Sequence, residues 1–564
     1  MKRNLNKLAH SDYDVLVIGG GIYGVAVAWD ATLRGLNVVL IDKGDFAGAT
    51  SSNSLKIIHG GLRYLQHLDF KRMRESIRER TVLMKIAPHL VHPLPVMMPT
   101  YGYASKSRLS LFFALLANDI IGFDRNNLRD PQKYLPRGHI ISRKKVKEIL
   151  PDYEMNNISG GALWYDCQCV NTERMAMSYL LTAVENGADA ANYVECIGFM
   201  GDPNKVNGIM AKDSLTGDTF EIRAQIVINT TGPWVDKILA GVCDKESNRQ
   251  FVPSSAMNII VRRNLLDRHA VGLTAPFQYH RDDGSVFNGT RMLFFVPWRD
   301  HTIIGTDHAP YYGSLDEFEI NEPQVEKFLD SVNQAYPSVK IRRDEIAFIH
   351  AGLLPMIGLN SNTGKVELLK QYKVHDHQVE DNIQGLITVT GVKYTTHRDV
   401  AQKTTDLVFN KLEKAAPKCT TDEIPIYGGE IERFDDYLSA ALREHSYDKK
   451  VLRHLVYSFG SRFKDILRYG DVVPDLLKNI TGSDEVIKAE VVHAVRNEMA
   501  VKLADVVMRR TDLGSAQFPG EKALYEVARI MASELGWNES MIQNEISETR
   551  TFYSHEIAAP NEVA

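Results

Sequence analysis

The feature that most constrains this chain is a glycine-rich turn between two apolar strands near its N-terminus. Residues 14–18 read Asp-Val-Leu-Val-Ile, residues 19–24 read Gly-Gly-Gly-Ile-Tyr-Gly, and a second apolar strand ends at Asp42. A Gly-x-Gly-x-x-Gly turn after a strand, with an acid about 20 residues further on, is typical of a βαβ unit that binds a dinucleotide. We therefore expect the chain to begin with such a unit.

Each glycine of this turn has its own physical role. Gly19 permits the tight turn, Gly21 lets the backbone approach a pyrophosphate, and Gly24 lets the helix pack closely on the strand. The helix N-terminus supplies free N–H groups and partial positive charge for the phosphates. Asp42 can accept hydrogen bonds from an adenosine ribose. An ordinary glycine turn would leave this acid unexplained.

Length and composition exclude several classes of protein. The 564 residues are too many for one core, so several domains are expected. The chain is 44% apolar and 24% charged with a net charge of −5, which gives no reason to expect nucleic acid as a partner. Its five cysteines are odd in number and contain no Cys-x-x-Cys pair, which fits a reducing compartment such as the cytoplasm. We expect no disulfide framework, no zinc site and no other metal site.

One segment bears on membrane association. No apolar segment of a signal peptide precedes the first strand, and the apolar run 109–123 is interrupted by Asn118 and Asp119. This run is too short for a membrane span of about 20 residues. Basic residues flank it at Lys106, Arg108 and Arg125. Two interpretations stay open, a helix lying in the membrane interface and a buried core helix.

The predicted secondary structure changes along the chain. The first half contains a loop of small residues at 44–54, a long helix at 62–90, a basic helix at 137–150, another helix at 173–186, and a buried strand with a small-residue turn at 225–233. Strand ends of this kind are where ligands bind in α/β sheets.

From about residue 251 the pattern becomes antiparallel. We expect strands at 258–261, 292–297, 302–306, near 346, at 367–375 and at 386–390, and a helix at 322–335. Residues 298–301 read as a hairpin turn. Helical patterns dominate from about residue 416 onward.

We therefore expect an α/β plus α+β chain of three domains. A discontinuous dinucleotide-binding domain takes residues 1–95, 151–250 and 380–415. A substrate-binding domain with an antiparallel sheet takes residues 96–150 and 251–379, and a helical C-terminal domain takes residues 416–564.

A second motif carries a resemblance to a known family. Residues 50–65 read Thr-Ser-Ser-Asn-Ser-Leu-Lys-Ile-Ile-His-Gly-Gly-Leu-Arg-Tyr-Leu and resemble the signature of the FAD-dependent glycerol-3-phosphate dehydrogenases and oxidases. The likeness extends over nearly the whole chain, through residues 231–234, 304–307, 391–396 and 503–511.

The resemblance implies FAD as cofactor, a Rossmann-like domain of the glutathione-reductase type, an antiparallel substrate domain and a helical cap. It implies oxidation of sn-glycerol 3-phosphate at C2 to dihydroxyacetone phosphate by hydride transfer to flavin N5. The electrons would pass to a membrane quinone, or to oxygen in the oxidase branch. A peripheral position on the inner face of the cell membrane follows from this, and a homodimer is compatible with it.

The resemblance also suggests which residues form the site. Arg63 and Tyr64 match the family's substrate-contacting pair, Lys393 matches a catalytic lysine between flavin and substrate, and His59 is the candidate base. Bidentate Arg suits a dianionic phosphate. The expected cofactor-binding residues are Gly19, Gly21, Gly24, Asp42, Ser51, Ser52, Gly60, Gly61, Gly232, Gly391 and Thr395. Alternatively, Arg63 is a surface ion-pair residue, His59 a core histidine and Lys393 a solvated strand-end lysine.

Three positions depart from the family pattern. Leu354 replaces the arginine expected to bind substrate, Val392 replaces a glycine, and His397 replaces a tyrosine. We expect all three around the substrate, so the cofactor is better defined than the substrate. Two rivals stay open, a related FAD enzyme for another small hydroxy or amino substrate and a silent flavin-binding sensor or assembly protein. A nicotinamide enzyme is disfavoured because no second dinucleotide turn follows a strand.

Overall fold

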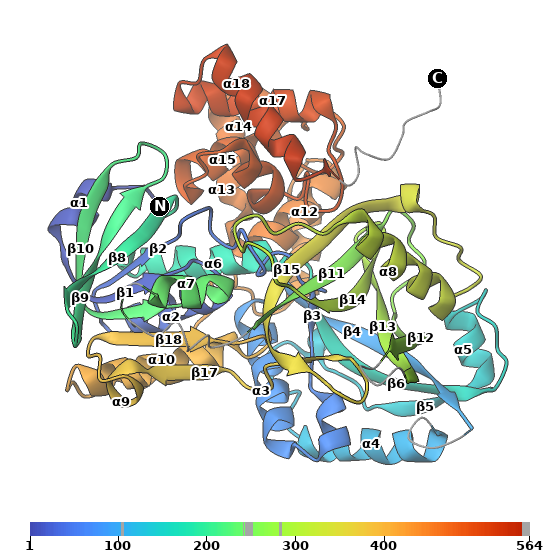
Figure 1. The fold of residues 1–564 in the computed structure, drawn as a ribbon. Helices are drawn as coiled ribbons and strands as arrows, with labels where there is room; N and C mark the ends of the chain where they lie inside the picture. The colour runs from blue at the N-terminus through green and yellow to red at the C-terminus, as the bar shows by residue number, and fades with distance from the viewer. Residues whose placement is uncertain (103–106, 241, 243–251, 281–284, 555–564) are drawn as a thin grey trace.

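The computed structural model describes residues 1–102, 107–240, 242, 252–280 and 285–554. Two β-sheets lie side by side, and the helical C-terminal region, drawn in orange and red, lies over both of them (Figure 1). This arrangement confirms the expected combination of a Rossmann-like sheet, an antiparallel sheet and a helical region.

The first sheet carries the glycine-rich turn. Its strands run in the order β17 (Lys373–Asp376), β18 (Leu386–Thr390), β10 (Thr219–Asn229), β1 (Asp12–Ile18), β2 (Val38–Ile41) and β7 (Asp189–Ala191). The pairs from β18 to β7 are parallel, and β17 is antiparallel to β18. An antiparallel arm of β8 (Val194–Asp202) and β9 (Lys205–Asp213) joins β10.

Helices cover this sheet, which is why its central strands are apolar along their whole length. Helix α2 (Ile22–Leu33) packs against α6 (Thr172–Glu185) and α10 (His397–Lys411). Val15, Val17 and Val38 are fully buried in the core that these helices close. The shorter helices α1 (Leu5–His10) and α7 (Val235–Leu239) flank the sheet, and α9 (His377–Glu380) follows β17.

The second sheet is antiparallel except for one pair. Its order is β16 (Val366–Leu368), β15 (Ile346–Leu359), β11 (Val252–Val261), β14 (His301–Pro310), β13 (Val286–Trp298), β12 (Ala270–His280), β4 (Val91–Tyr101), β6 (Ile158–Cys169) and β3 (Ile57–Ile58), with β5 (His139–Ser142) on β6. Among the described strands of this second sheet, only β12 and β4 pair in parallel. Helix α8 (Glu322–Ala335) has the predicted bounds, because Asn321 and Gln324 form a capping box at its start.

Some predicted elements differ from the structure. The single helix expected at 62–90 is wrong: a 3₁₀ segment (Leu62–His67) and α3 (Phe70–Ile86) are separated where Leu68 has a φ of +52°. The carboxylate of Asp69 then accepts a hydrogen bond from Arg72 N at 3.0 Å and starts α3. The basic helix expected at 137–150 contains β5 before α5 (Arg143–Ile149).

The expected domain bounds differ from sheet membership at a few strands. The strand predicted at 367–375 is divided between β16 in the second sheet and β17 in the first. Strands β3 and β6, which the bounds assign to the dinucleotide-binding domain, pair within the second sheet. Strand pairing over long sequence separations decides this, and local sequence patterns do not report it.

The C-terminal region is helical, as predicted. Its helices are α11 (Phe434–Glu444), α12 (Lys449–Phe459), α13 (Phe463–Leu467), α14 (Tyr469–Val472), α15 (Lys488–Glu498), α16 (Leu503–Asp505), α17 (Glu521–Leu535) and α18 (Glu539–Thr551). Two apolar clusters form its cores, one around Leu452 and Leu455 and the other around Leu524 and Val527.

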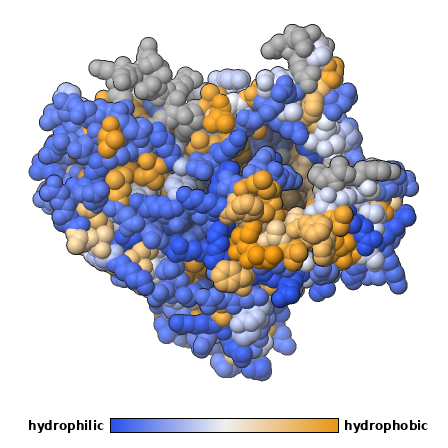
Figure 2. Space-filling model, turned by 90° about the horizontal axis from the view of Figure 1, so that it is seen from below, coloured by the Kyte–Doolittle hydropathy of each residue, from blue (hydrophilic) through white to orange (hydrophobic). Residues whose placement is uncertain are grey.

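Helix α4 (Arg108–Ile121) contains most of the apolar run 109–123 and is not a core helix. Leu115 is its one buried residue, and Leu109, Phe112, Phe113, Leu116, Ile120 and the following Phe123 are exposed. Figure 2 views this face of the molecule and shows apolar side chains gathered in one patch beside a polar surface. No helix within the described residues is long and apolar enough to cross a membrane. Lys106 lies outside the described residues.

Candidate functional site

A cavity of about 1050 Å³ opens where the two sheets and the helical region meet. The first sheet contributes the turns after β1, β2 and β10, and the second contributes residues of β11, β14 and β15. The helical region closes the cavity with Lys502, Arg509 and Phe552. All three parts of the chain are therefore needed to form this one site.

The glycine turn has the geometry that the sequence predicts. Gly19 has a φ of +103°, which favours glycine, and a Cβ atom there would lie 2.8 Å from Thr230 O. A Cβ atom on Gly24 would lie 1.9 Å from Gly19 O, so this glycine lets α2 pack against the strand end. Gly21 is the N-cap of α2, and its Cβ would meet only Ser51 Oγ, at 3.2 Å. Ser51 Oγ accepts a hydrogen bond from Ile22 N at the same helix end.

Asp42 lies at the end of β2 and lines the cavity. Its Oδ2 atom accepts a hydrogen bond from Gly20 N at 2.6 Å, and its Oδ1 atom accepts one from Gly44 N at 2.8 Å. Burial raises the pKa of this carboxyl, and the two amide hydrogen bonds oppose the rise. Each carboxylate oxygen keeps a further acceptor site for a ribose hydroxyl.

His59 is held by a buried aspartate that the sequence did not identify. The imidazole lines the cavity with 47% of its side chain exposed, and its Nδ1 lies 3.3 Å from Asp166 Oδ2. Asp166 Oδ1 accepts hydrogen bonds from Gly60 N at 2.7 Å and from Arg80 Nη1 at 2.8 Å. Burial opposes ionisation of Asp166, but His59, Arg80 and Gly60 N hold its pKa at about 2.

This arrangement fixes how His59 can act. An ionised carboxylate only accepts hydrogen bonds, so Nδ1 of a neutral His59 donates to Asp166. The other ring nitrogen, Nε2, is then the acceptor and can take a proton. His59 thus has the geometry of a base backed by a carboxylate, whereas Asp166 is a positioning residue.

Five further residues of the predicted site also line the cavity, namely Lys393, Tyr64, Gly391, Thr395 and Gly232. Lys393 Nζ lies 4.4 Å from the centroid of the Tyr64 ring, a cation–π contact. Lys393 O accepts a hydrogen bond from Tyr23 Oη at 2.9 Å. A Cβ atom on Gly391 would lie 2.4 Å from the same hydroxyl, so glycine lets this turn pack against Tyr23.

Other predicted site residues lie outside the cavity lining, namely Gly24, Ser52, Gly60, Gly61 and Arg63. A Cβ atom on Gly60 would lie 2.2 Å from Arg80 Nη1, and one on Gly61 would lie 2.7 Å from the Tyr64 ring. These glycines therefore allow protein groups to approach. The Arg63 side chain is exposed. Burial is the main cause of the lowered pKa values of His308 and Lys365, and the positive charge of Arg63 lowers both pKa values further.

The three residues that depart from the family pattern do not all lie in the same place. Leu354 and Val392 line the cavity, as expected. His397 does not, and the expectation that it borders the substrate is wrong. It is fully buried at the start of α10 between the rings of Tyr179 and Tyr394, and burial lowers its pKa to about 4.

Sequence reasoning missed further residues of the lining. Asn258 and Thr306 line the cavity from neighbouring strands, and Thr306 Oγ1 donates to Asn258 Oδ1 at 2.7 Å. His308 follows on β14. The usable signal was a polar residue inside an apolar strand, which applies equally to Asp166 in β6.

Comparison with known proteins agrees with this geometry. A family model described as FAD dependent oxidoreductase matches residues 14–392, and one described as the C-terminal domain of alpha-glycerophosphate oxidase matches residues 419–542. The chain belongs to this family of FAD-dependent oxidoreductases. It is 32% identical over 553 residues to a Synechocystis protein named glycerol-3-phosphate dehydrogenase, covering 96% of this chain and 97% of that one.

Two further relatives support the assignment. The human mitochondrial glycerol-3-phosphate dehydrogenase is 30% identical over 566 residues, covering 97% of this chain and 74% of that protein. The crystal structure of a glycerol-3-phosphate dehydrogenase from Bacillus halodurans complexed with FAD matches with a TM-score of 0.75 at 25% identity, covering 99% of this chain and 98% of that one.

The described residues fit FAD, the cofactor of this family. The space in front of Gly21 is open except for Ser51 Oγ, so a ligand can approach the backbone there. The amide groups at the start of α2 are suited to bind a pyrophosphate. Asp42 has acceptor capacity for a ribose, and the Gly391–Thr395 turn borders the same cavity as His59. Gly19, Gly21, Ser51 and Asp42 would hold the adenosine diphosphate half of the cofactor.

Gly21→Ala should yield a protein that retains its fold but lacks bound flavin. The new methyl group needs only a small displacement of Ser51 Oγ, yet it stands where the backbone must contact the pyrophosphate. Gly102→Ala is the matched control, because a Cβ atom there meets nothing within 4 Å. Flavin content per chain, read from the absorption spectrum, decides the outcome. Full occupancy in Gly21→Ala would contradict the assignment of this turn.

Proposed function

We propose that this protein oxidises sn-glycerol 3-phosphate at C2 to dihydroxyacetone phosphate and passes the electrons to a quinone. The observation that carries the proposal is a histidine, His59, that has a carboxylate partner and lines the same cavity as Lys393 and Tyr64. The choice of substrate is supported by the similarity of this chain, along nearly its whole length, to a protein named glycerol-3-phosphate dehydrogenase.

The chemistry divides between the cofactor and the protein. FAD, when bound, accepts a hydride at N5. His59 Nε2 accepts the proton of the C2 hydroxyl, and Asp166 stabilises the resulting imidazolium because its carboxylate is already ionised. Arg80 prevents Asp166 from turning away, since it donates both to Asp166 Oδ1 and to Tyr165 O.

Cations near the cavity would hold the substrate phosphate. Lys393 lines the cavity, and Arg63 lies near enough to His308 and Lys365 to influence both electrostatically. Lys365 donates to Thr290 O at 2.6 Å. We infer that Lys393 and Arg63 are the primary phosphate ligands, with the exposed Arg63 side chain turning inward, and that Lys365 supplies part of the charge missing at Leu354.

Anaerobic mixing with glycerol 3-phosphate should bleach the flavin absorption band of the wild-type protein. His59→Ala should slow this reduction by ~10²–10⁴-fold, the usual contribution of a general base. Asp166→Asn should slow it less and leave flavin content unchanged, because an amide keeps the shape but not the charge. His67→Ala, an exposed histidine of the neighbouring 3₁₀ segment, is the control. An unbleached band in the wild type would instead favour a silent flavin-binding protein.

Leu354 favours a second candidate function, the oxidation of another small hydroxy or amino compound. A leucine in place of a guanidinium makes the cavity more apolar and removes a strong phosphate interaction. The rest of the reaction machinery, His59 with Asp166, would serve either substrate.

Leu354→Arg separates the two candidates. If the substrate is a phosphate ester, this change should lower KM for glycerol 3-phosphate, and Arg63→Ala should raise it, since the change removes one of the two cations that would hold the phosphate. Steady-state turnover with a dye acceptor over a substrate panel measures both. Wild-type preference for an uncharged compound, with no turnover in Leu354→Arg, would establish the second candidate.

We also infer peripheral binding to the inner face of the cell membrane, where a quinone would be reached. The exposed apolar side chains of α4, with Arg108 at its start, support this inference. The double change Phe112→Ser/Phe113→Ser should reduce flotation with anionic liposomes at low salt, whereas Val472→Ser, an exposed apolar site elsewhere, should not. If wild-type protein does not float, a soluble electron acceptor becomes the better proposal.

A further inference from the structure

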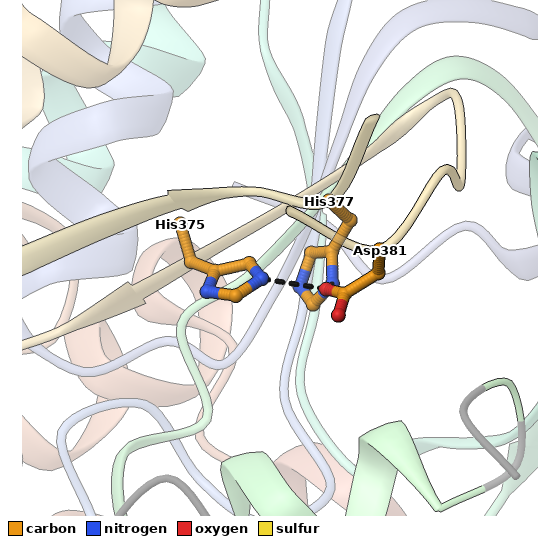
Figure 3. Close-up of side chains that lie close together, drawn as sticks. All are labelled: His375, His377 and Asp381. Carbon is orange, nitrogen blue, oxygen red and sulfur yellow. Dashed lines mark hydrogen bonds and ion pairs between the residues drawn. The ribbon is translucent and has the colours of Figure 1, made fainter. Parts of the chain in front are cut away.

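A group of two histidines and one aspartate lies at the outer edge of the first sheet. His375 is in β17, His377 begins α9, and Asp381 follows the end of that helix. Figure 3 shows the three side chains pointing toward one another. One ligand atom from each lies within 4.8 Å of the other two, and the group is unique among the described residues in this respect. None of the three lines the flavin cavity.

Both imidazoles converge on one carboxylate oxygen. His375 Nε2 lies 2.6 Å and His377 Nδ1 lies 2.7 Å from Asp381 Oδ2. His375 and His377 are buried, whereas the Asp381 side chain is 19% exposed and gives access from solvent. Two imidazoles and a carboxylate form the ligand set of zinc sites that keep one position for water.

An oxygen atom lies behind each imidazole, as a metal site needs. His377 Nε2 lies 2.8 Å from Thr388 Oγ1, which fixes the ring with Nδ1 toward Asp381. His375 Nδ1 lies 3.2 Å from Glu380 Oε2. A histidine that binds a metal through one nitrogen commonly donates its other N–H to a carboxylate or other oxygen.

The two nitrogens of His375 face two different carboxylates, those of Asp381 and Glu380. Its buried Nδ1 forms no hydrogen bond within the described structure. With a cation at Nε2, the ring proton would lie on Nδ1, on the side of Glu380, which is where a metal-bound histidine commonly has a carboxylate.

We propose that His375, His377 and Asp381 bind a divalent cation of the zinc class. Imidazole ligands select such an ion over Mg²⁺ or Ca²⁺, which prefer oxygen. Zinc bonds of 2.0–2.2 Å place tetrahedral ligand atoms about 3.3 Å apart, so Asp381 Oδ2 must move away from both nitrogens to admit an ion. The ion fastens β17 and α9 to each other at the sheet edge. Thr388, which supports His377, lies in β18, and Thr390 of that strand lines the flavin cavity.

Chelator-treated flavoprotein titrated with ZnCl₂ tests the proposal by calorimetry and by metal analysis. Wild type should bind one zinc ion per chain, with a rise in thermal midpoint, and should give no such signal with Mg²⁺. Asp381→Asn keeps the side-chain shape and should weaken zinc binding by more than 100-fold, whereas the supporting change Glu380→Gln should weaken it ~10–100-fold.

His139→Gln, which replaces an exposed histidine elsewhere, is the matched control and should bind zinc as wild type does. Unchanged flavin content shows that each variant is folded. Absence of zinc binding by wild type, or equal stoichiometry and affinity in wild type and Asp381→Asn, overturns the proposal.

Discussion

The buried ion network around Asp45 joins the helical C-terminal region to the dinucleotide-binding sheet. Asp45 Oδ2 accepts from Arg509 Nε at 2.5 Å, and its Oδ1 accepts from Arg510 Nη2 at 2.7 Å. Burial opposes ionisation of Asp45, but the two guanidinium groups hold its pKa at about 2. A second buried pair, Arg174 with Glu498, lies beside it, since Arg174 also donates to Arg510 O. Separating the two regions would leave these charges unpaired, which is costly.

This network has a direct consequence for the site. Asp45 lies three residues after Asp42, so the arginines hold the loop that follows Asp42 on the cavity wall. Arg509 itself lines the cavity, together with Lys502 and Phe552. The helical region is thus part of the cavity wall, although Lys502 and Arg509 lie more than 450 residues after the glycine turn.

The same logic explains which site residues could be predicted. The roles of Gly19, Gly21 and Asp42 follow from a local pattern, because strand, turn and helix are adjacent in sequence and fix one another's geometry. His59 could be named, but Asp166 could not, since it approaches from a strand more than 100 residues away. Gly60 shows the converse error: its lack of a side chain serves Arg80, a contact that no local motif reports.

The sequence by itself determined the dinucleotide-binding unit, the antiparallel and helical regions, and the family. These depend on periodicity and on short motifs whose meaning is local. The tertiary structure decided which strands share a sheet, that Leu354 faces the cavity while His397 is buried behind Tyr394, and that the apolar α4 lies on the surface. These outcomes depend on packing between residues distant in sequence, where burial and pairing of charges outweigh any local preference.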